Sequence, residues 1–131
     1  MNEFQFNQNP KEKSCGWRCL HYIYPESISY EDFLHKFQEL TPCKSGVWFK
    51  VICSILGFHG IKYKFVVPKS TGLYLIWSGV WDSAGGHYFV YHDGMMYDSL
   101  ASGPYSYPLE ELLVKLETTN VKDHFVCMQV L

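Results

Sequence analysis

The order of hydrophobic patterns along this chain limits its fold more than any other sequence feature. Apolar residues recur at helical spacing as far as Gly57, whereas from Ile61 onward they alternate with charged residues or form short continuous runs. A period near 3.6 residues is typical of an amphipathic helix, and a period of two is typical of a half-buried strand. Helices grouped before strands indicate an α+β domain. We therefore expect N-terminal helices packed on an antiparallel sheet.

Capping residues place three helices in the first half of the chain. Ser14 and Ser29 are candidate N-caps, because a serine side chain can accept a hydrogen bond from an unpaired amide at a helix start. Gly57 is expected to close the third helix, since glycine readily adopts the backbone conformation of a helix end. The predicted helices span residues 15–22, 30–40, ended by Pro42, and 47–56.

An Asp93-Gly94 pair between two apolar runs is the strongest local signal in the second half. This pair favours a hairpin with a two-residue turn, in which His92 would pair with Met95. The continuous apolar run at residues 73–77 is typical of a central strand. Strands are expected at residues 61–67, 73–77, 87–92, 95–100 and 125–130, with a further helix at 108–119.

Composition excludes several classes of protein. A chain of 131 residues fits a single domain, 1–131. Hydrophobic residues make up 47% and charged residues 18%, which excludes intrinsic disorder. The formal net charge of -2 implies no basic surface, so nucleic-acid binding is not expected. No apolar run approaches the roughly 18 residues that a membrane span needs, so no membrane association is expected.

Cysteine usage indicates free thiols in a cytoplasmic protein. The chain has 5 cysteines, and its first ten residues are polar and carry no apolar signal region. A zinc site needs a second pair of ligands besides the cluster of Cys15, Cys19 and His21, and the sequence offers none. Neither a metal nor another cofactor is therefore expected.

Cys15 is the candidate nucleophile. It falls in the first turn of the first predicted helix and follows Lys11 and Lys13. The helix dipole and nearby cations favour the thiolate, which is the reactive form of cysteine. Gly16 is interpreted as leaving space beside the sulfur for a substrate backbone. An ordinary buried cysteine is the alternative.

The predicted hairpin supplies partners for this thiol. With Asp93 and Gly94 as the turn, Phe89 faces Asp98, and His87 becomes a diagonal neighbour of Asp98 on the same face of the sheet. A histidine oriented by a carboxylate is the second half of a nucleophilic triad. Cys15, His87 and Asp98 therefore have the residue types and the order of a thiol hydrolase.

The remaining histidines are expected to be structural. His21 and His35 lie on predicted helices, at the surface or at an edge. His92 points to the face opposite His87, because side chains alternate along a strand.

A thiol hydrolase also needs hydrogen-bond donors for the oxyanion that forms during acyl transfer. The backbone amide of Cys15 is one candidate, because it has no acceptor within the helix. A side-chain amide upstream would be the second. Gln8 is our choice, with Asn9 and Gln5 as competitors.

These residues resemble a known family. The segment from Gln8 to Leu20, with Ser14-Cys15-Gly16 at its centre, is similar to the nucleophile segment of papain-like cysteine peptidases. The nearest resemblance is to the bacteriocin-processing (double-glycine) peptidases. Gly86-His87 resembles their Gly-His motif, and the segment ending in Asp98 resembles their strand that ends in Asp. Ser14 stands where that family has Asp, and Ser99 where it has Pro.

The resemblance implies a papain-like fold and a role for each residue. Cys15 would be the nucleophile, His87 the general base and acid, Asp98 the residue that orients His87, and Gln8 the oxyanion donor. The implied substrate is a peptide or protein, for which a Gly-Gly tail is one candidate because Gly85, Gly86 and Gly16 would permit close backbone approach. De-ubiquitinating enzymes of the Josephin type are similar in layout.

Two other functions are compatible with the same fold. A catalytically silent domain could bind a partner through aromatic residues at 77–81 and 105–107. A transferase or amidase could use the same thioester with a different acceptor.

Overall fold

A computed structural model describes residues 1–9, 11–37, 39, 47, 49–79, 86–119 and 125–131. The expected helix stop at Pro42, the glycine Gly85 and the aromatic residue Trp81 lie outside these ranges. In the described part, no helix has the length and apolar character that would let it cross a membrane.

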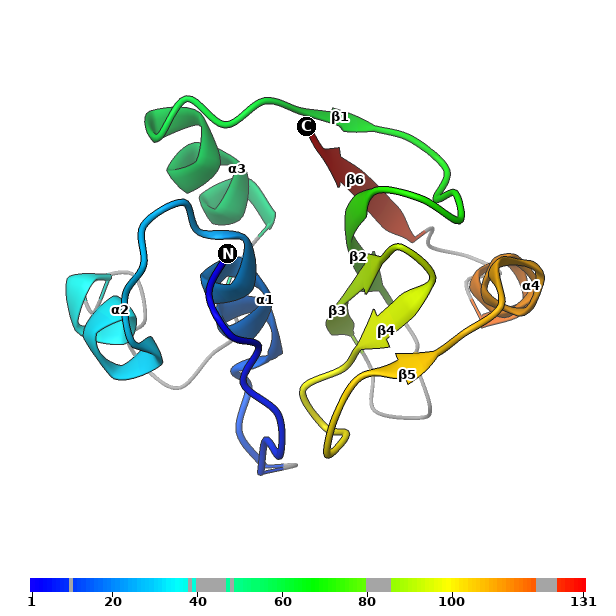
Figure 1. The fold of residues 1–131 in the computed structure, drawn as a ribbon, viewed down its shortest axis with the longest axis horizontal. Coiled ribbons are helices and arrows are strands. Elements are labelled where there is room, and N and C mark those ends of the chain that lie inside the picture. Colours follow the sequence, from blue (N-terminus) through cyan, green and yellow to red (C-terminus); the bar gives the residue numbers. More distant parts are fainter. Residues whose placement is uncertain (10, 38, 40–46, 48, 80–85, 120–124) are drawn as a thin grey trace.

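The described chain is mixed α+β, with helices on both faces of an antiparallel sheet (Figure 1). The helices described are α1 (Cys15–Ile23), α2 (Tyr30–Lys36), α3 (Phe49–Phe58) and α4 (Leu109–Thr119). The strands are β1 (Tyr63–Phe65), β2 (Leu73–Ser78), β3 (His87–His92), β4 (Met95–Tyr97), β5 (Tyr105–Ser106) and β6 (Val126–Val130). Their order across the sheet is β1-β6-β2-β3-β4-β5. The expected class and the packing of N-terminal helices on the sheet are confirmed.

Each face of the sheet has its own hydrophobic core. Alternate residues of the central strands β2 and β3 point to opposite faces, as the two-residue period of a strand requires. Leu75 and Val90 face the N-terminal helices and pack with α1 residues such as Leu20. Ile76 and Phe89 face the other way and pack with Leu112 and other residues of α4. The continuous apolar sequence of β2 therefore reflects burial on both sides.

The hairpin formed by β3 and β4 has the register that the sequence predicts. His92 pairs with Met95, and Val90 pairs with Tyr97. Asp93 and Gly94 both have positive φ values, 49° and 82°, which is the backbone of the two-residue turn that matches strand twist. The Asp93 carboxylate also accepts a hydrogen bond from the Gly72 amide at 2.8 Å, which ties the turn to the start of β2.

Two predictions about helix ends are wrong. Ser14 occupies the N-cap position of α1, but its side chain makes no capping hydrogen bond, because its Oγ accepts from Arg18 Nε at 2.9 Å. The helix α3 continues through Gly57 to Phe58. The left-handed residue that ends the helix is Gly60, with a φ of 71°. By contrast, Ser29 caps α2 as predicted by accepting from the Asp32 amide.

The remaining differences concern lengths and one missed strand. The second helix ends at Lys36, and the first strand is confined to Tyr63–Phe65. The short strand β5 was not expected, because its two exposed residues carry no alternating pattern. It exists because β4 offers it a pairing edge, with Met96 opposite Tyr105.

The positive φ at the hairpin turn gives a test of the fold. We expect Gly94→Ala to lower the free energy of unfolding by about 1 kcal/mol, because a side chain in the left-handed region costs roughly that much. Urea denaturation followed by circular dichroism measures the change. Gly57→Ala is the matched control, because Gly57 is helical and a Cβ there meets no atom within 4 Å. Its effect should be neutral or stabilising, and an equal loss in both variants would contradict the assigned turn.

Candidate active site

The packing of α1 on β3 brings Cys15 and His87 together. Each is the first residue of its element, and the two side chains lie close enough for each to shift the pKa of the other. Both residues are buried, with exposed fractions of 8% and 4%. The backbone amides of Gly16 and Tyr88 also lower the pKa of the Cys15 thiol. The sulfur therefore lies where three groups stabilise a negative charge.

Asp98 holds the other side of the His87 ring. Its Oδ1 lies 2.8 Å from His87 Nε2 and also accepts from the Leu100 amide at 3.0 Å. The expectation that the hairpin places His87 beside Asp98 is therefore confirmed. Because Nε2 faces the carboxylate, Nδ1 is the ring nitrogen left for the thiol of Cys15. The carboxylate thus fixes the orientation of the ring.

The interaction between Cys15 and His87 lowers the pKa of the thiol and raises the pKa of the imidazole. Burial raises the pKa of the Cys15 thiol, but the interaction with His87 and the Tyr88 and Gly16 amides together outweigh burial and hold that pKa below its ordinary value. Burial lowers the pKa of His87, whereas Asp98 and Cys15 raise it, and the net result is a pKa of about 9. Both shifts favour the pair in which Cys15 is a thiolate and His87 an imidazolium.

The carboxylate of Asp98 remains ionised in this setting. Burial raises its pKa, but the hydrogen bond and charge of His87, the Leu100 amide and the charge of Lys115 together bring the pKa below the ordinary value. Two other buried thiols behave in the opposite way. Burial raises the pKa of Cys19 and, at Cys127, raises it to about 12. Of these three thiols, Cys15 is the one whose pKa favours the thiolate.

Among the three candidate amides, Gln8 is the buried one. Its exposed fraction is 7%, and its side chain is bound at both ends, to Ser99 and to the Glu12 carbonyl. Gln5 and Asn9 are more open to solvent and make only local contacts, with Glu3 and Lys11 respectively. A buried, fixed amide is better suited than a mobile one to stabilise charge at a defined position.

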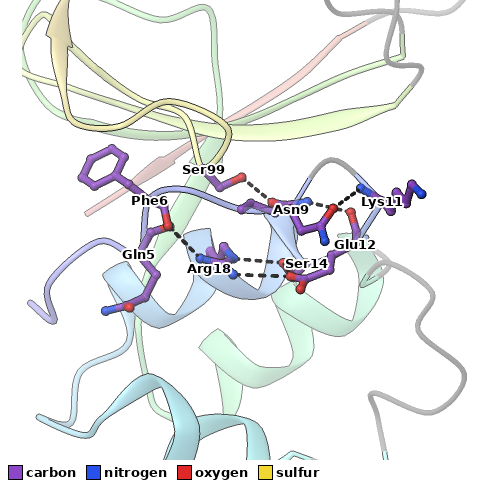
Figure 2. A network of polar contacts seen from close by, with 9 residues as sticks. Gln5, Phe6, Asn9, Lys11, Glu12, Ser14, Arg18 and Ser99 are labelled. Atoms are coloured by element: carbon purple, nitrogen blue, oxygen red, sulfur yellow. Dashed lines mark hydrogen bonds and ion pairs between the residues drawn. The ribbon is translucent and has the colours of Figure 1, made fainter.

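The segment that carries Gln8 is fastened to α1 by Arg18. Figure 2 shows its guanidinium between two parts of the segment, donating to the Gln5 and Phe6 carbonyls at 3.2 Å and to Ser14 Oγ. A longer contact of 3.5 Å joins it to the Glu12 carboxylate. Sequence reasoning missed Arg18 and Ser99, because both act through contacts with residues far away in the chain or with backbone atoms.

The interpretation of Gly16 as space for a substrate is wrong. A Cβ at Gly16 would lie 2.3 Å from Val47 Cγ1 and 3.0 Å from the Tyr88 ring, so this space is already filled by the protein. Glycine is required because α1 approaches these two residues closely. Gly86 is exposed at the start of β3, yet a Cβ there would lie 3.2 Å from the Trp77 indole.

The cluster of Cys15, Cys19 and His21 does not form a ligand set. In the ranges that the structure describes, no group of three His, Cys, Asp or Glu side chains could hold a metal ion. His21 is buried, with an exposed fraction of 1%, which corrects its expected surface position. Its Nε2 lies 2.6 Å from the Ile28 carbonyl, and its ring packs against Phe33 of α2.

The shifted pKa values predict how Cys15 reacts. We expect iodoacetamide to alkylate Cys15 rapidly at pH 7 and to leave Cys127 unlabelled, as measured by peptide mass spectrometry over time. In Asp98→Asn the pKa of His87 should fall, because the carboxylate that raises it is gone. The His87 ring then loses its proton at a lower pH than in the unchanged protein. At pH 8 the neutral ring no longer stabilises the thiolate, so alkylation of Cys15 should slow several-fold.

The control for this substitution lies in the same hairpin. Asp93→Asn removes a carboxylate that binds Gly72 and leaves His87 with its own partner. Its alkylation profile should match that of the unchanged protein. If Asp98→Asn also matched it, the assigned role of Asp98 would have to be abandoned.

A function for this site has to be argued from the chemistry of its residues, because the comparisons with known proteins supply none. Neither a model of a known protein family nor a curated protein matches this chain. What remains is the arrangement itself in the described part of the chain, where Cys15 interacts with His87, Asp98 binds His87, and the Gln8 amide is bound to Ser99, the residue after Asp98.

Proposed function

We propose that this protein is a cysteine peptidase with a papain-like fold, which hydrolyses a peptide or isopeptide bond through a thioester at Cys15. The observation that carries the proposal is the contact of the Cys15 thiol with a His87 ring that Asp98 holds at 2.8 Å. A thiolate beside an oriented imidazolium is an activated nucleophile with its acid catalyst in place.

Each residue has one task in the proposed reaction. The Cys15 thiolate attacks the carbonyl carbon, and the electron pair of the C=O bond moves to oxygen. The resulting oxyanion accepts hydrogen bonds from the Cys15 amide and the Gln8 side chain. His87 gives its proton to the departing amine as the C–N bond breaks. His87 then takes a proton from water, which attacks the thioester and releases the acid and the thiol.

Energetics favour this proposal over a catalytically silent binding domain. A buried ion pair is expensive to desolvate, and apolar residues in its place are often as stabilising. The exposed fractions of His87 and Asp98, 4% and 7%, place their charges out of water. Strongly shifted pKa values of this kind cluster at functional sites. A reactive thiol–imidazole pair is a more direct reason for the arrangement than stability.

The proposed substrate is a peptide or protein with a Gly-Gly tail, in a cytoplasmic setting. The tail is supported by the resemblance to double-glycine peptidases, since Gly16 no longer argues for substrate space. The cytoplasmic setting is supported by the free thiols of Cys15, Cys19, Cys53 and Cys127, because a reducing compartment keeps thiols free. A transferase or amidase would share the thioester and differ only in its acceptor.

A covalent probe tests the proposed chemistry. A peptide ending in Gly-Gly with an electrophilic propargylamide in place of the carboxylate should add one equivalent to Cys15, as seen by intact-mass and peptide-mass measurement. Cys15→Ala should abolish the adduct, and His87→Ala should slow it by roughly a hundredfold or more. Cys53→Ala, which removes a partly buried thiol of α3, should leave the rate unchanged.

The outcome also separates the rival functions. Equal labelling of several thiols, or an adduct whose rate ignores His87, would reject the peptidase proposal and leave a binding domain. If Cys15 is labelled, a Gly-Gly thioester substrate incubated with and without an added amine distinguishes the acceptor. A free acid as the main product indicates a hydrolase, and an amide indicates a transferase.

A further inference from the structure

We propose that Ser99 is a positioning residue that aims the Gln8 side-chain amide at the oxyanion. This inference rests on the proposed function and adds to it a residue that touches neither the substrate nor the thiol. Ser99 directly follows Asp98 in the chain and is fully buried, with an exposed fraction of 0%.

Ser99 holds Gln8 by its side chain and by its backbone. The Ser99 hydroxyl donates to Gln8 Oε1 at 2.5 Å, and the Gln8 amide N–H donates to the Ser99 carbonyl at 2.7 Å. The contact continues where the Asn7 amide donates to the Ala101 carbonyl at 3.0 Å. Two bonds to one residue fix both the place of Gln8 and the rotation of its side chain.

The hydrogen-bond partners of the Gln8 side chain also determine which of its atoms, Oε1 or Nε2, can donate to the oxyanion. Gln8 Nε2 donates to the Glu12 carbonyl at 2.7 Å, and a carbonyl can only accept. Oε1 is therefore the end that faces Ser99, and the hydroxyl must be the donor. Nε2 has two hydrogens, and within the described residues one of them is used by Glu12. We assign the second hydrogen to the oxyanion.

Without the Ser99 hydroxyl this orientation loses its support. A rotation of the amide by half a turn would exchange Oε1 and Nε2, and an oxygen aimed at the oxyanion would repel it. The Ser99 hydroxyl and the Glu12 carbonyl oppose that rotation together, because one demands an acceptor and the other a donor. The Ser99 hydroxyl therefore fixes the rotation of the Gln8 amide, which an apolar side chain of the same size could not do.

The same dipeptide therefore serves both halves of the reaction. Asp98 orients the imidazole of His87, and Ser99 orients the amide of Gln8. Both contacts start from the segment that follows β4, so the position of this segment sets the geometry of the base and of the oxyanion donor at once.

Two reagents of different chemistry separate the role of Ser99 from that of the thiol. Iodoacetamide alkylates the Cys15 thiolate by displacing iodide, and no oxyanion forms. With p-nitrophenyl acetate the thiolate attacks the carbonyl carbon, an oxyanion forms, and its collapse expels p-nitrophenolate and leaves an acetyl thioester. The ratio of the acetylation rate to the alkylation rate at Cys15, measured by mass spectrometry, reports on the oxyanion donors alone.

We expect Ser99→Ala to lower this ratio by about tenfold, which is less than the roughly hundredfold or greater loss reported for removal of an oxyanion donor itself. Gln8→Ala should lower the ratio further, and Ser99→Ala added to Gln8→Ala should have no additional effect, because Ser99 acts through Gln8. Ser99→Gly removes the same hydroxyl and should reproduce the loss. Ser54→Ala is the control, because the Ser54 hydroxyl binds the Lys50 carbonyl on α3.

The controls distinguish the failure of this inference from the failure of the proposed function. A cysteine-containing peptide gives the ratio for a thiol without a site. If the unchanged protein shows only that ratio, it has no oxyanion donors, and the peptidase proposal is rejected together with the role of Ser99. The other outcome is that the unchanged protein shows a higher ratio than the peptide. If both Ser99 variants then show the same ratio as the unchanged protein, only the role of Ser99 is overturned. Urea denaturation confirms that each variant is folded.

Discussion

The contact between the first turn of α1 and the first residues of β3 is the interaction on which the rest of the site depends. It requires Gly16, because Val47 and Tyr88 fill the space that a side chain would occupy. This close approach places the Cys15 sulfur against the His87 ring and the Tyr88 amide. The helix layer supplies the thiol and the sheet supplies its base, so the site exists only where the two layers are packed.

The N-terminal segment joins these same two layers a second time. Arg18 fastens the segment to α1 through the Gln5 and Phe6 carbonyls, and Ser99 fastens it to the chain that follows β4. Because both attachments use fixed polar groups in a largely buried setting, Gln8 has little freedom to move. Preorganisation of this kind is what an oxyanion donor needs, since a group that must reorient during the reaction contributes less.

Local sequence signals predicted the parts of the fold that are determined locally. The Asp93-Gly94 turn fixes the register of its hairpin within a few residues, so the proximity of His87 and Asp98 could be derived by counting along two strands. The alternation of apolar residues gave the strands, and helical spacing gave the helices. The class and the helix-on-sheet packing follow from those patterns.

The predictions that proved wrong depend on groups that are distant in sequence. Ser14 does not cap α1, because Arg18 takes its hydroxyl. His21 is buried because α2 covers it, which no property of α1 reveals. The strand β5 forms only because β4 leaves an edge open. Ser99 stands beside Asp98 in the sequence, yet its partner is 91 residues away. Contacts between residues so far apart in the sequence arise from tertiary packing, and the periodicity of apolar residues does not predict them.

The strand order also determines when the molecule can assemble during synthesis. β6 lies between β1 and β2, although it follows both by many residues. The pairing of Gln8 with Ser99 likewise joins an early segment to a late one. A ribosome-bound chain that has not yet exposed residues 99–130 therefore lacks the partner of Gln8 and the strand that joins β1 to β2. The thiol can acquire its complete surroundings only after Ser99 has left the ribosome.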